Sequence, residues 1–383
     1  MIIYGAIFIP ILTAIVLYIF FRHKTVWWEF SIPLGASFLF IVLMKFIIET
    51  AMVQSKEYWG SFISRIEYFE EWDEWIDQTC TRSCCCDSNG ENCGTETYDC
   101  SYRLYHPPCW QIITSTEEVV SISQSEYNRL TKFFGNQKFT DMHRGYYTID
   151  GDKYSCDWMR DSIKAIPVTT VHYYENRIKV ADQSVFHFQE VDTGDVQKFK
   201  LKDYPGITDS YKQDAVLGDY SNDAKLANQK FKYINGLLGH KKEVRLFVLV
   251  FQNQPIDAGF YQEWYWSGAN MNELAVGIGA DYSRRVKWCH PISWTPAEKL
   301  KTDIKQFIIS QDTLNLSALA SYMQIQVDKQ FIRRNFEEFD YLTVEPPTWA
   351  IALAYVMTIL LNTGLSLWVI TNEIDESGDK KYK

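Results

Sequence analysis

Three long apolar stretches constrain this chain more than any other feature. Two lie near the N-terminus, at residues 2–21 and 26–48, and the third covers residues 348–371. Each provides the roughly 20 apolar residues with which a helix crosses about 30 Å of hydrocarbon. The sequence therefore predicts three transmembrane helices, with the lipid bilayer as a partner. Asn362 is the one strongly polar side chain of the third stretch, and we expect it to hydrogen-bond to another span.

Basic residues in short loops predict the orientation. Arg22, His23 and Lys24 separate the first two stretches, and three lysines lie in the tail at residues 372–383. Such residues favour the cytoplasmic side, so the N-terminus is expected outside and the C-terminus inside. The main domain is then extracytoplasmic. In an alternative reading, the first stretch is only a signal anchor, and the rest of the topology is inverted.

Residue patterns divide the remaining chain into an α+β architecture. Spacing of apolar residues from Trp59 to Ile76 predicts an amphipathic stalk helix over residues 49–79. A cysteine-rich cap follows at 80–110, and alternating aromatic runs predict a mainly β region at 111–239. Residues 240–347 form an α/β module, in which "VRLFVLVF" is a strand buried on both faces.

Further elements of the module follow from local signals. The sequence predicts a helix that begins with Asp257 as its cap, strands over "NELAVGIGAD" and "RRVKWCHPIS", and a helix with Thr295 as its cap and Pro296 at its first position. A last helix is expected over "TLNLSALASYMQIQVDKQF". This order, with "FQNQPIDAGFYQEWYWSGANMNELAVGIGAD" leading into a basic strand, resembles TPM-type domains of membrane-anchored proteins. The resemblance implies an accessory or assembly role, or a phosphatase activity.

Two other segments carry a second resemblance. "YDCSYRLYHPPCW" and "RGYYTIDGDKYSCDW" look like membrane proteins encoded by tailed phages and their bacterial hosts. This resemblance implies no particular function.

Eight of the nine cysteines are disulfide candidates. On an exported face thiols oxidise, so disulfides are favoured; the candidates are Cys80, Cys84, Cys85, Cys86, Cys93, Cys100, Cys109 and Cys156. Cys156 could pair back to the cluster, while Cys289 is expected to be a buried free thiol. A zinc site made by Cys84, Cys93, Cys100 and His106 is the alternative, although paired C-x2-C spacings are absent.

No other pattern predicts a cofactor, and none is expected. Asp150, Asp152 and Asp157 could hold calcium, but they lack the remaining ligands of a calcium loop, and an Asp-Gly hairpin turn explains the run more simply. The histidines stand outside the familiar hydrolase motifs. Neighbouring residues on a strand point to opposite faces, so Cys289 and His290 are not expected to form a catalytic pair.

These features favour a non-enzymatic function in binding or assembly at the membrane. A net charge of −10 without basic clusters excludes nucleic acid as a partner class. We expect instead a protein partner or a second copy of the chain. A membrane-anchored hydrolase, phosphatase-like and built on the module, is the alternative.

Overall fold

The computed structural model describes residues 2–21, 29, 31–84, 94–134, 139–144, 150–157, 166–181, 188–209 and 211–372. It is a mixed α+β structure that divides into two compact units. The first unit contains residues 1–56, 173–189 and 335–383, and the second contains residues 57–172 and 190–334.

The first unit is a group of long apolar helices. Its described helices are η1 (Ile2–Ile7), α1 (Phe8–Phe21), α2 (Ser31–Val53), η4 (Phe336–Phe339) and α9 (Thr348–Asn372). Three segments are long and apolar enough to cross a membrane: Ile3–Phe20, Ser31–Val53 and Thr348–Thr371. The second helix ends later than predicted, since it continues past Ile48 through Glu49 and Thr50 to Val53; residues 26–28 and 30 of the predicted span lie outside the described part of the chain.

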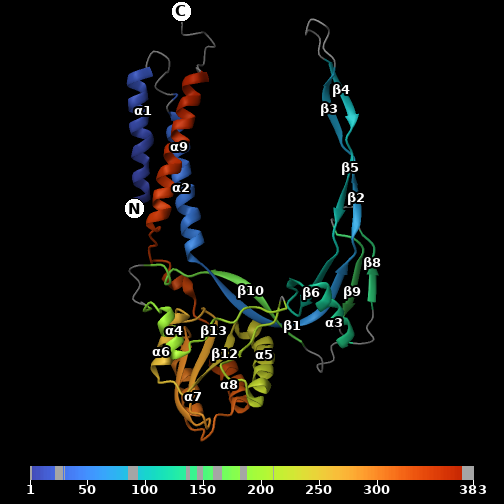
Figure 1. Ribbon diagram of the computed structural model, residues 1–383, viewed down its shortest axis with the longest axis vertical. Coiled ribbons are helices and arrows are strands. Elements are labelled where there is room, and N and C mark those ends of the chain that lie inside the picture. Colours follow the sequence, from blue (N-terminus) through green and yellow to red (C-terminus); the bar gives the residue numbers. More distant parts are fainter. Residues whose placement is uncertain are drawn as a thin grey trace, which may run out of the picture. The chain divides into compact units, whose positions relative to one another are not determined.

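Contacts between these helices fix their directions. Lys45, in the second half of α2, lies 5.5 Å from the ring of Tyr4. Figure 1 shows the N-terminus at the end of the helix group at which α2 ends and α9 begins. The predicted role of Asn362 is confirmed, because its Nδ2 donates to Ser37 Oγ of α2 at 3.4 Å and both residues are buried.

The second unit contains two β regions and an α/β module. The strands are β1 (Gln54–Phe69), β2 (Trp72–Ile76), β3 (Thr79–Cys84), β4 (Gly94–Asp99), β5 (Tyr102–His106), β6 (Cys109–Thr114), β7 (Val119–Ser121), β8 (Phe139–Met142), β9 (Lys153–Asp157), β10 (Pro167–Glu175), β11 (Val216–Leu217), β12 (Arg245–Gln252), β13 (Glu273–Ala280) and β14 (Val286–Ser293). The helices are α3 (Gln124–Phe134), α4 (Thr193–Phe199), α5 (Asn222–Lys242), α6 (Asp257–Tyr265), α7 (Glu298–Ile309) and α8 (Leu316–Gln330).

The predicted stalk helix is wrong, because α2 ends at Val53 and β1 follows at once. The pairing of β1 with β6 shifts register between Ile63 and Arg65. Such a bulge adds one residue to a strand and interrupts its two-residue alternation. The buried Ile63 and Ile66 are therefore three residues apart, which is also the spacing of a helical face.

A long antiparallel ribbon extends from the sheet that contains β1. Its strands pair as β1 with β6, β2 with β5, and β3 with β4, out to Cys84 opposite Gly94. The first interruption contains Pro107 and Pro108, which have no N–H to donate to a ladder. We call the described residues 70–84 and 94–108 the arm (Figure 1).

The α/β module has three layers. Its sheet has the order β11-β12-β13-β14, in which the first three strands are parallel and β14 is antiparallel. Helices α5, α7 and α8 supply one core cluster, and α4 and α6 supply the other on the opposite face. Burial on both faces explains the continuous apolar run of β12, which is buried from Arg245 to Phe251 and confirms the predicted strand.

Several local expectations need correction. The described part of residues 111–239 is not mainly β, since it includes α3, α4 and most of α5, which has Ser221 Oγ accepting from Ala224 N as its cap. Helix α7 begins at Glu298, with Ala297 as its N-cap, and not at Pro296. Thr295 Oγ1 still accepts from Ala297 N, and it donates to Ile332 O. The N-cap of α6 is Ile256 rather than Asp257. The strands β13 and β14 and the helix α8 are confirmed.

The predicted Asp-Gly hairpin at residues 150–151 lies partly outside the described residues, since its first strand was expected over 146–149. In the described part of the chain, β9 pairs with β1 on one edge and with β8 on the other. Gly151 is required for another reason: a Cβ there would lie 1.9 Å from the carbonyl oxygen of Glu70. Residues 145–149 lie outside the described part of the chain.

Candidate functional site

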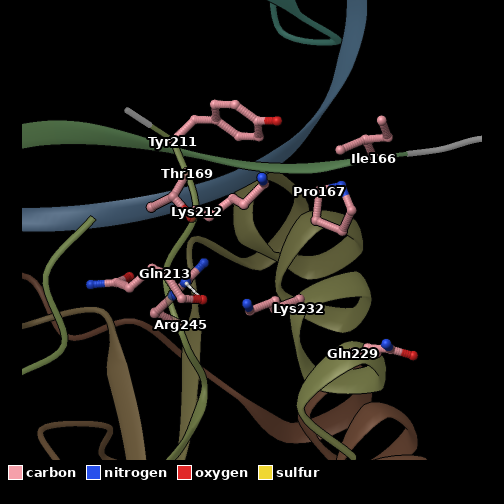
Figure 2. Close-up of a pocket in the computed structure, with 9 residues that line it drawn as sticks. All are labelled: Ile166, Pro167, Thr169, Tyr211, Lys212, Gln213, Gln229, Lys232 and Arg245. Atoms are coloured by element: carbon pink, nitrogen blue, oxygen red, sulfur yellow. Dashed lines mark hydrogen bonds between the residues drawn. The ribbon is translucent and has the colours of Figure 1, made fainter. Parts of the chain in front are cut away.

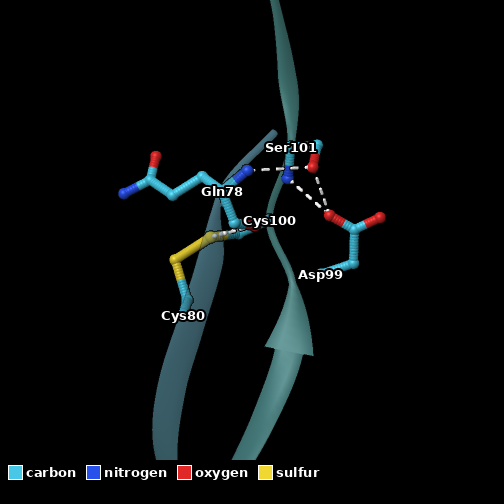
Figure 3. Close-up of a disulfide and its surroundings, with 5 residues drawn as sticks. All are labelled: Gln78, Cys80, Asp99, Cys100 and Ser101. Carbon is cyan, nitrogen blue, oxygen red and sulfur yellow. Dashed lines mark hydrogen bonds between the residues drawn. A yellow bond between two sulfur atoms is a disulfide. The ribbon is translucent and has the colours of Figure 1, made fainter. Parts of the chain in front are cut away.

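One disulfide closes the arm near its second interruption. Cys80 of β3 is bonded to Cys100, directly after β4, with 5.8 Å between their Cα atoms. The backbone N–H of Cys100 donates to Gln78 O at 2.9 Å, and the N–H of Gln78 donates to Ser101 Oγ at 3.1 Å. Figure 3 shows these bonds joining the two sides of the ribbon where the β ladder is interrupted. The pairing confirms Cys80 and Cys100 as disulfide cysteines.

The other predicted disulfide cysteines have different outcomes. Cys109 is a free thiol, which corrects its assignment. Cys109 lies opposite Phe69 on one side of β1, while Cys156 lies opposite Ile66 on the other side. Two strand spacings of about 4.8 Å separate them, which is too far for a disulfide. Cys85, Cys86 and Cys93, and the side chains of Cys84 and Cys156, lie outside the described residues.

The proposed zinc set does not come together in the structure. Cys100 is oxidised to a disulfide, so it cannot supply a thiolate. His106 Nε2 lies 2.7 Å from Glu74 Oε2, and its ring stacks on Trp72. The other two predicted zinc ligands cannot be placed: Cys93 and the side chain of Cys84 lie outside the described part of the chain.

The proposed calcium set is also separated in space. Asp152 Oδ1 accepts from the N–H of Arg144, and its Oδ2 lies 3.2 Å from His143 Nδ1. Asp157 ends β9, five residues further along an extended strand, which corresponds to about 16 Å. Asp150 is exposed. Among the described residues, no group of three or more His, Cys, Asp or Glu side chains is arranged to hold a metal ion.

Cys289 and His290 lie on opposite faces of β14, as predicted. Cys289 is buried among the side chains of the α5, α7 and α8 cluster, and this burial raises the pKa of its thiol to about 12. His290 Nε2 pairs with Glu263 of α6, on the other face, at 2.7 Å. The thiol therefore has neither a base nor the low pKa of a nucleophile.

The arm presents aromatic side chains to solvent. Between β2 and β5, Trp75 lies opposite Arg103, and Asp73 lies opposite Tyr105. These four residues point to the same face, and Trp75 is 58% exposed and Tyr105 56% exposed. Tyr98, Tyr102 and Leu104 are also exposed. Because an isolated two-stranded ribbon has no core of its own, aromatic residues at such positions indicate a binding surface.

The arm is also strongly acidic. Its described residues contain seven carboxylates against two arginines. Most of these carboxylates are exposed, and a side-chain hydrogen bond from Tyr105 to Glu71 joins an aromatic residue to one of them. The predicted stalk helix over residues 49–79 included the acidic "EYFEEWDEW" run, so the common face of Trp75 and Tyr105 in a β ribbon was not expected.

The second candidate site lies at the carboxyl ends of the parallel strands. In α/β sheets, ligands bind in the crevice at this edge. Here a cavity of about 110 Å³ is bounded by Asp219, beyond β11, and by Asp281 and Arg284, beyond β13. Arg284 Nη1 lies 2.6 Å from Asp219 Oδ2, and its Nη2 lies 3.1 Å from Asp223 Oδ2.

The carboxylates of this edge are held in their ionised form. Burial acts to raise the pKa of Asp219, but hydrogen bonds from Ser221 and Arg284 keep it below its usual value. A hydrogen bond from the Arg285 N–H lowers the pKa of Asp281. The Asp223 carboxylate accepts from Leu316 N and Ser317 N at the start of α8. A general acid needs a raised pKa, so these groups suit an ion-pair network better than acid catalysis.

Comparison with protein-family models, with curated proteins and with solved structures finds no match to this chain.

Proposed function

We propose that this chain is a membrane-anchored binding or assembly protein whose arm docks on a protein partner outside the cytoplasm. The observation that carries the proposal is the exposed aromatic and acidic surface of the arm around Trp75 and Tyr105. Aromatic residues dominate the centres of protein interfaces, and complementary charge steers association. The partner is therefore expected to carry a basic surface with apolar pockets.

Two features support the extracytoplasmic location. Disulfides persist in oxidising compartments, and Cys80 is bonded to Cys100. The basic residues of the loop at 22–24 and of the tail favour the cytoplasmic side, which leaves residues 54–347 outside. The three apolar helices, each long enough to span the bilayer, suit this topology.

The proposal is tested by isolating the full chain, tagged at its C-terminus, from membranes of the cells that produce it. We expect a partner in fixed stoichiometry, whose recovery falls at least tenfold in a Trp75→Ser/Tyr105→Ser variant. The matched control is Tyr220→Ser/Tyr282→Ser, since these two tyrosines are 87% and 73% exposed and lie outside the arm. Equal recovery with the arm variant and the control variant would refute docking through the arm.

A second candidate function is a membrane-anchored phosphatase-like hydrolase on the TPM-like module. It is favoured by the position of Asp219 and Asp281 around one cavity at the carboxyl edge of the parallel strands. The test is hydrolysis of p-nitrophenyl phosphate by the full chain, with and without divalent cations. Activity that is lost in both Asp219→Asn and Asp281→Asn would support this function, and an inactive wild-type protein would exclude it.

A further inference from the structure

A second cavity, of about 250 Å³, lies at the opposite edge of the module. It is lined by side chains from β10, from the segment before β11, from α5 and from the first residue of β12: Ile166, Pro167, Thr169, Tyr211, Lys212, Gln213, Gln229, Lys232 and Arg245. Figure 2 shows Lys232 reaching from α5 toward Arg245 and Gln213. The volume lies below the usual range for drug-sized ligands, so only a small molecule fits.

Arg245 is the unusual member of this lining. It is 2% exposed, although it carries a charged guanidinium with five N–H donors. The only hydrogen bond that its guanidinium makes among the described residues is a 3.4 Å contact from Nη2 to Gln213 O, and Nε has no partner. Burial of a charge with so few hydrogen bonds is unfavourable unless an anion compensates it.

The hydrogen bonds around Arg245 go mainly to other groups. Glu273 is the register partner of Arg245 on β13, but its carboxylate accepts hydrogen bonds from Tyr204 and Asn270. Burial raises the pKa of Glu273 and lowers that of Arg245 to about 10, while the attraction between the two groups opposes both shifts. Gln213 Oε1 is a second buried atom without a partner at this site.

The other two cations of the lining are already neutralised. Lys232 Nζ lies 2.7 Å from Asp214 Oδ1, and Lys212 Nζ lies 2.9 Å from Asp209 Oδ2 and 3.6 Å from Glu126 Oε1. By contrast, no carboxylate of the described residues forms a salt bridge with the Arg245 guanidinium, whose Nε has no hydrogen-bond partner. The rest of the wall includes the apolar side chains of Ile166 and Pro167 and the ring of Tyr211.

We propose that this cavity binds a small organic monocarboxylate, whose carboxylate pairs with the Arg245 guanidinium and whose short apolar body packs on Ile166, Pro167 and Tyr211. Arginine binds carboxylates through two parallel N–H···O bonds, and the unpaired Nε of Arg245 can provide one of them. The ligand carboxylate has no proton to donate to Gln213 Oε1, so that oxygen would accept a hydrogen bond from an ordered water instead. This site is independent of docking through the arm.

The test uses the full chain in detergent micelles at constant ionic strength, with sodium butanoate as the probe. Butanoate is expected to raise the midpoint of thermal unfolding in a saturable manner, because a ligand of the folded state stabilises it by mass action. Butanamide, the neutral isostere, is expected to have no effect. Equal responses to butanoate and butanamide would overturn the proposal, and so would protection by inorganic phosphate alone.

Two variants locate the site. Arg245→Met removes the charge and keeps an unbranched chain, and a buried charge is often replaced in this way without loss of folding. Thr169→Phe fills the cavity from β10 and leaves Arg245 in place. Both are expected to abolish the response to butanoate, whereas Lys241→Gln, at an exposed ion pair with Asp328, should keep it. A full response in a folded Arg245→Met or Thr169→Phe protein would refute the assignment.

Discussion

Removal of the Cys80–Cys100 disulfide should loosen the arm and leave the rest of the molecule folded. The bond closes a loop of 20 residues, and the loss of chain entropy in the open state corresponds to about 3 kcal/mol. A two-stranded ribbon is marginal by itself, so this amount is a large part of its local stability. The double variant Cys80→Ser/Cys100→Ser is the perturbation, and Cys109→Ser, at a free thiol, is the control.

The assay is native-state hydrogen exchange of the full chain. Each 1.4 kcal/mol is a factor of ten in an opening equilibrium, so amides of β3 and β4 should exchange on the order of a hundredfold faster in the double variant. Amides of β12 and β13 should be unaffected, because their core clusters do not include the arm. Unchanged protection of β3 and β4 would refute the reasoning, as would an equal effect of Cys109→Ser.

Three further predictions concern the body of the second unit, each measured on the full chain in detergent. A hydrogen bond from Arg129 holds the pKa of Glu126 at about 2, against 4.5 for the free side chain. The ionised Glu126 therefore contributes up to about 3 kcal/mol to the free energy of unfolding above pH 4.5, and this contribution is lost as the pH falls towards 2. Glu126→Gln should therefore lower the urea midpoint at pH 7 and flatten its dependence on pH in that window. Gly60→Ala should lower the melting temperature through a loss of about 1 to 3 kcal/mol, because the new Cβ would lie 2.1 Å from Asn235 O; an unchanged melting temperature would contradict this contact. Arg333→Met should lower the free energy of unfolding, measured with urea, by about 3 to 5 kcal/mol, because it leaves the buried Glu57 without its ion pair. The control is Lys241→Gln, which removes an exposed ion pair and should lower the free energy of unfolding by only about 0 to 1 kcal/mol. A loss in Arg333→Met no larger than that of the control would refute the prediction.

The parts of the fold that were predictable from sequence are those in which one local signal dominates. The three apolar helices follow from length and hydropathy, and β12 follows from an uninterrupted apolar run. The stalk was mispredicted because a β-bulge near Arg65 gives a strand the apolar spacing of a helix. The strand assignment needed the pairing partner β6, which lies some forty residues further along the chain.

The candidate sites were less predictable, because they depend on contacts between distant segments. Predicted export and the cysteine count indicated disulfides but not their pairing. The β3–β4 register places Cys80 opposite Tyr98, and the disulfide runs diagonally to Cys100, two residues further along, with 5.8 Å between the Cα atoms. Arg245 stands at the start of an otherwise apolar strand, which is a signal that sequence analysis did not use. How few hydrogen bonds its guanidinium makes depends on the segment around Gln213, which lies beside Arg245 only in the folded chain.

The most direct test of docking through the arm is site-specific photo-crosslinking in intact cells. A photoreactive amino acid is placed at Trp75 on the arm, or at Tyr282 outside it, in the full membrane-inserted chain. We predict one discrete protein adduct from position 75 and none from position 282. No adduct from position 75, or the same adducts from both positions, would contradict the proposed function.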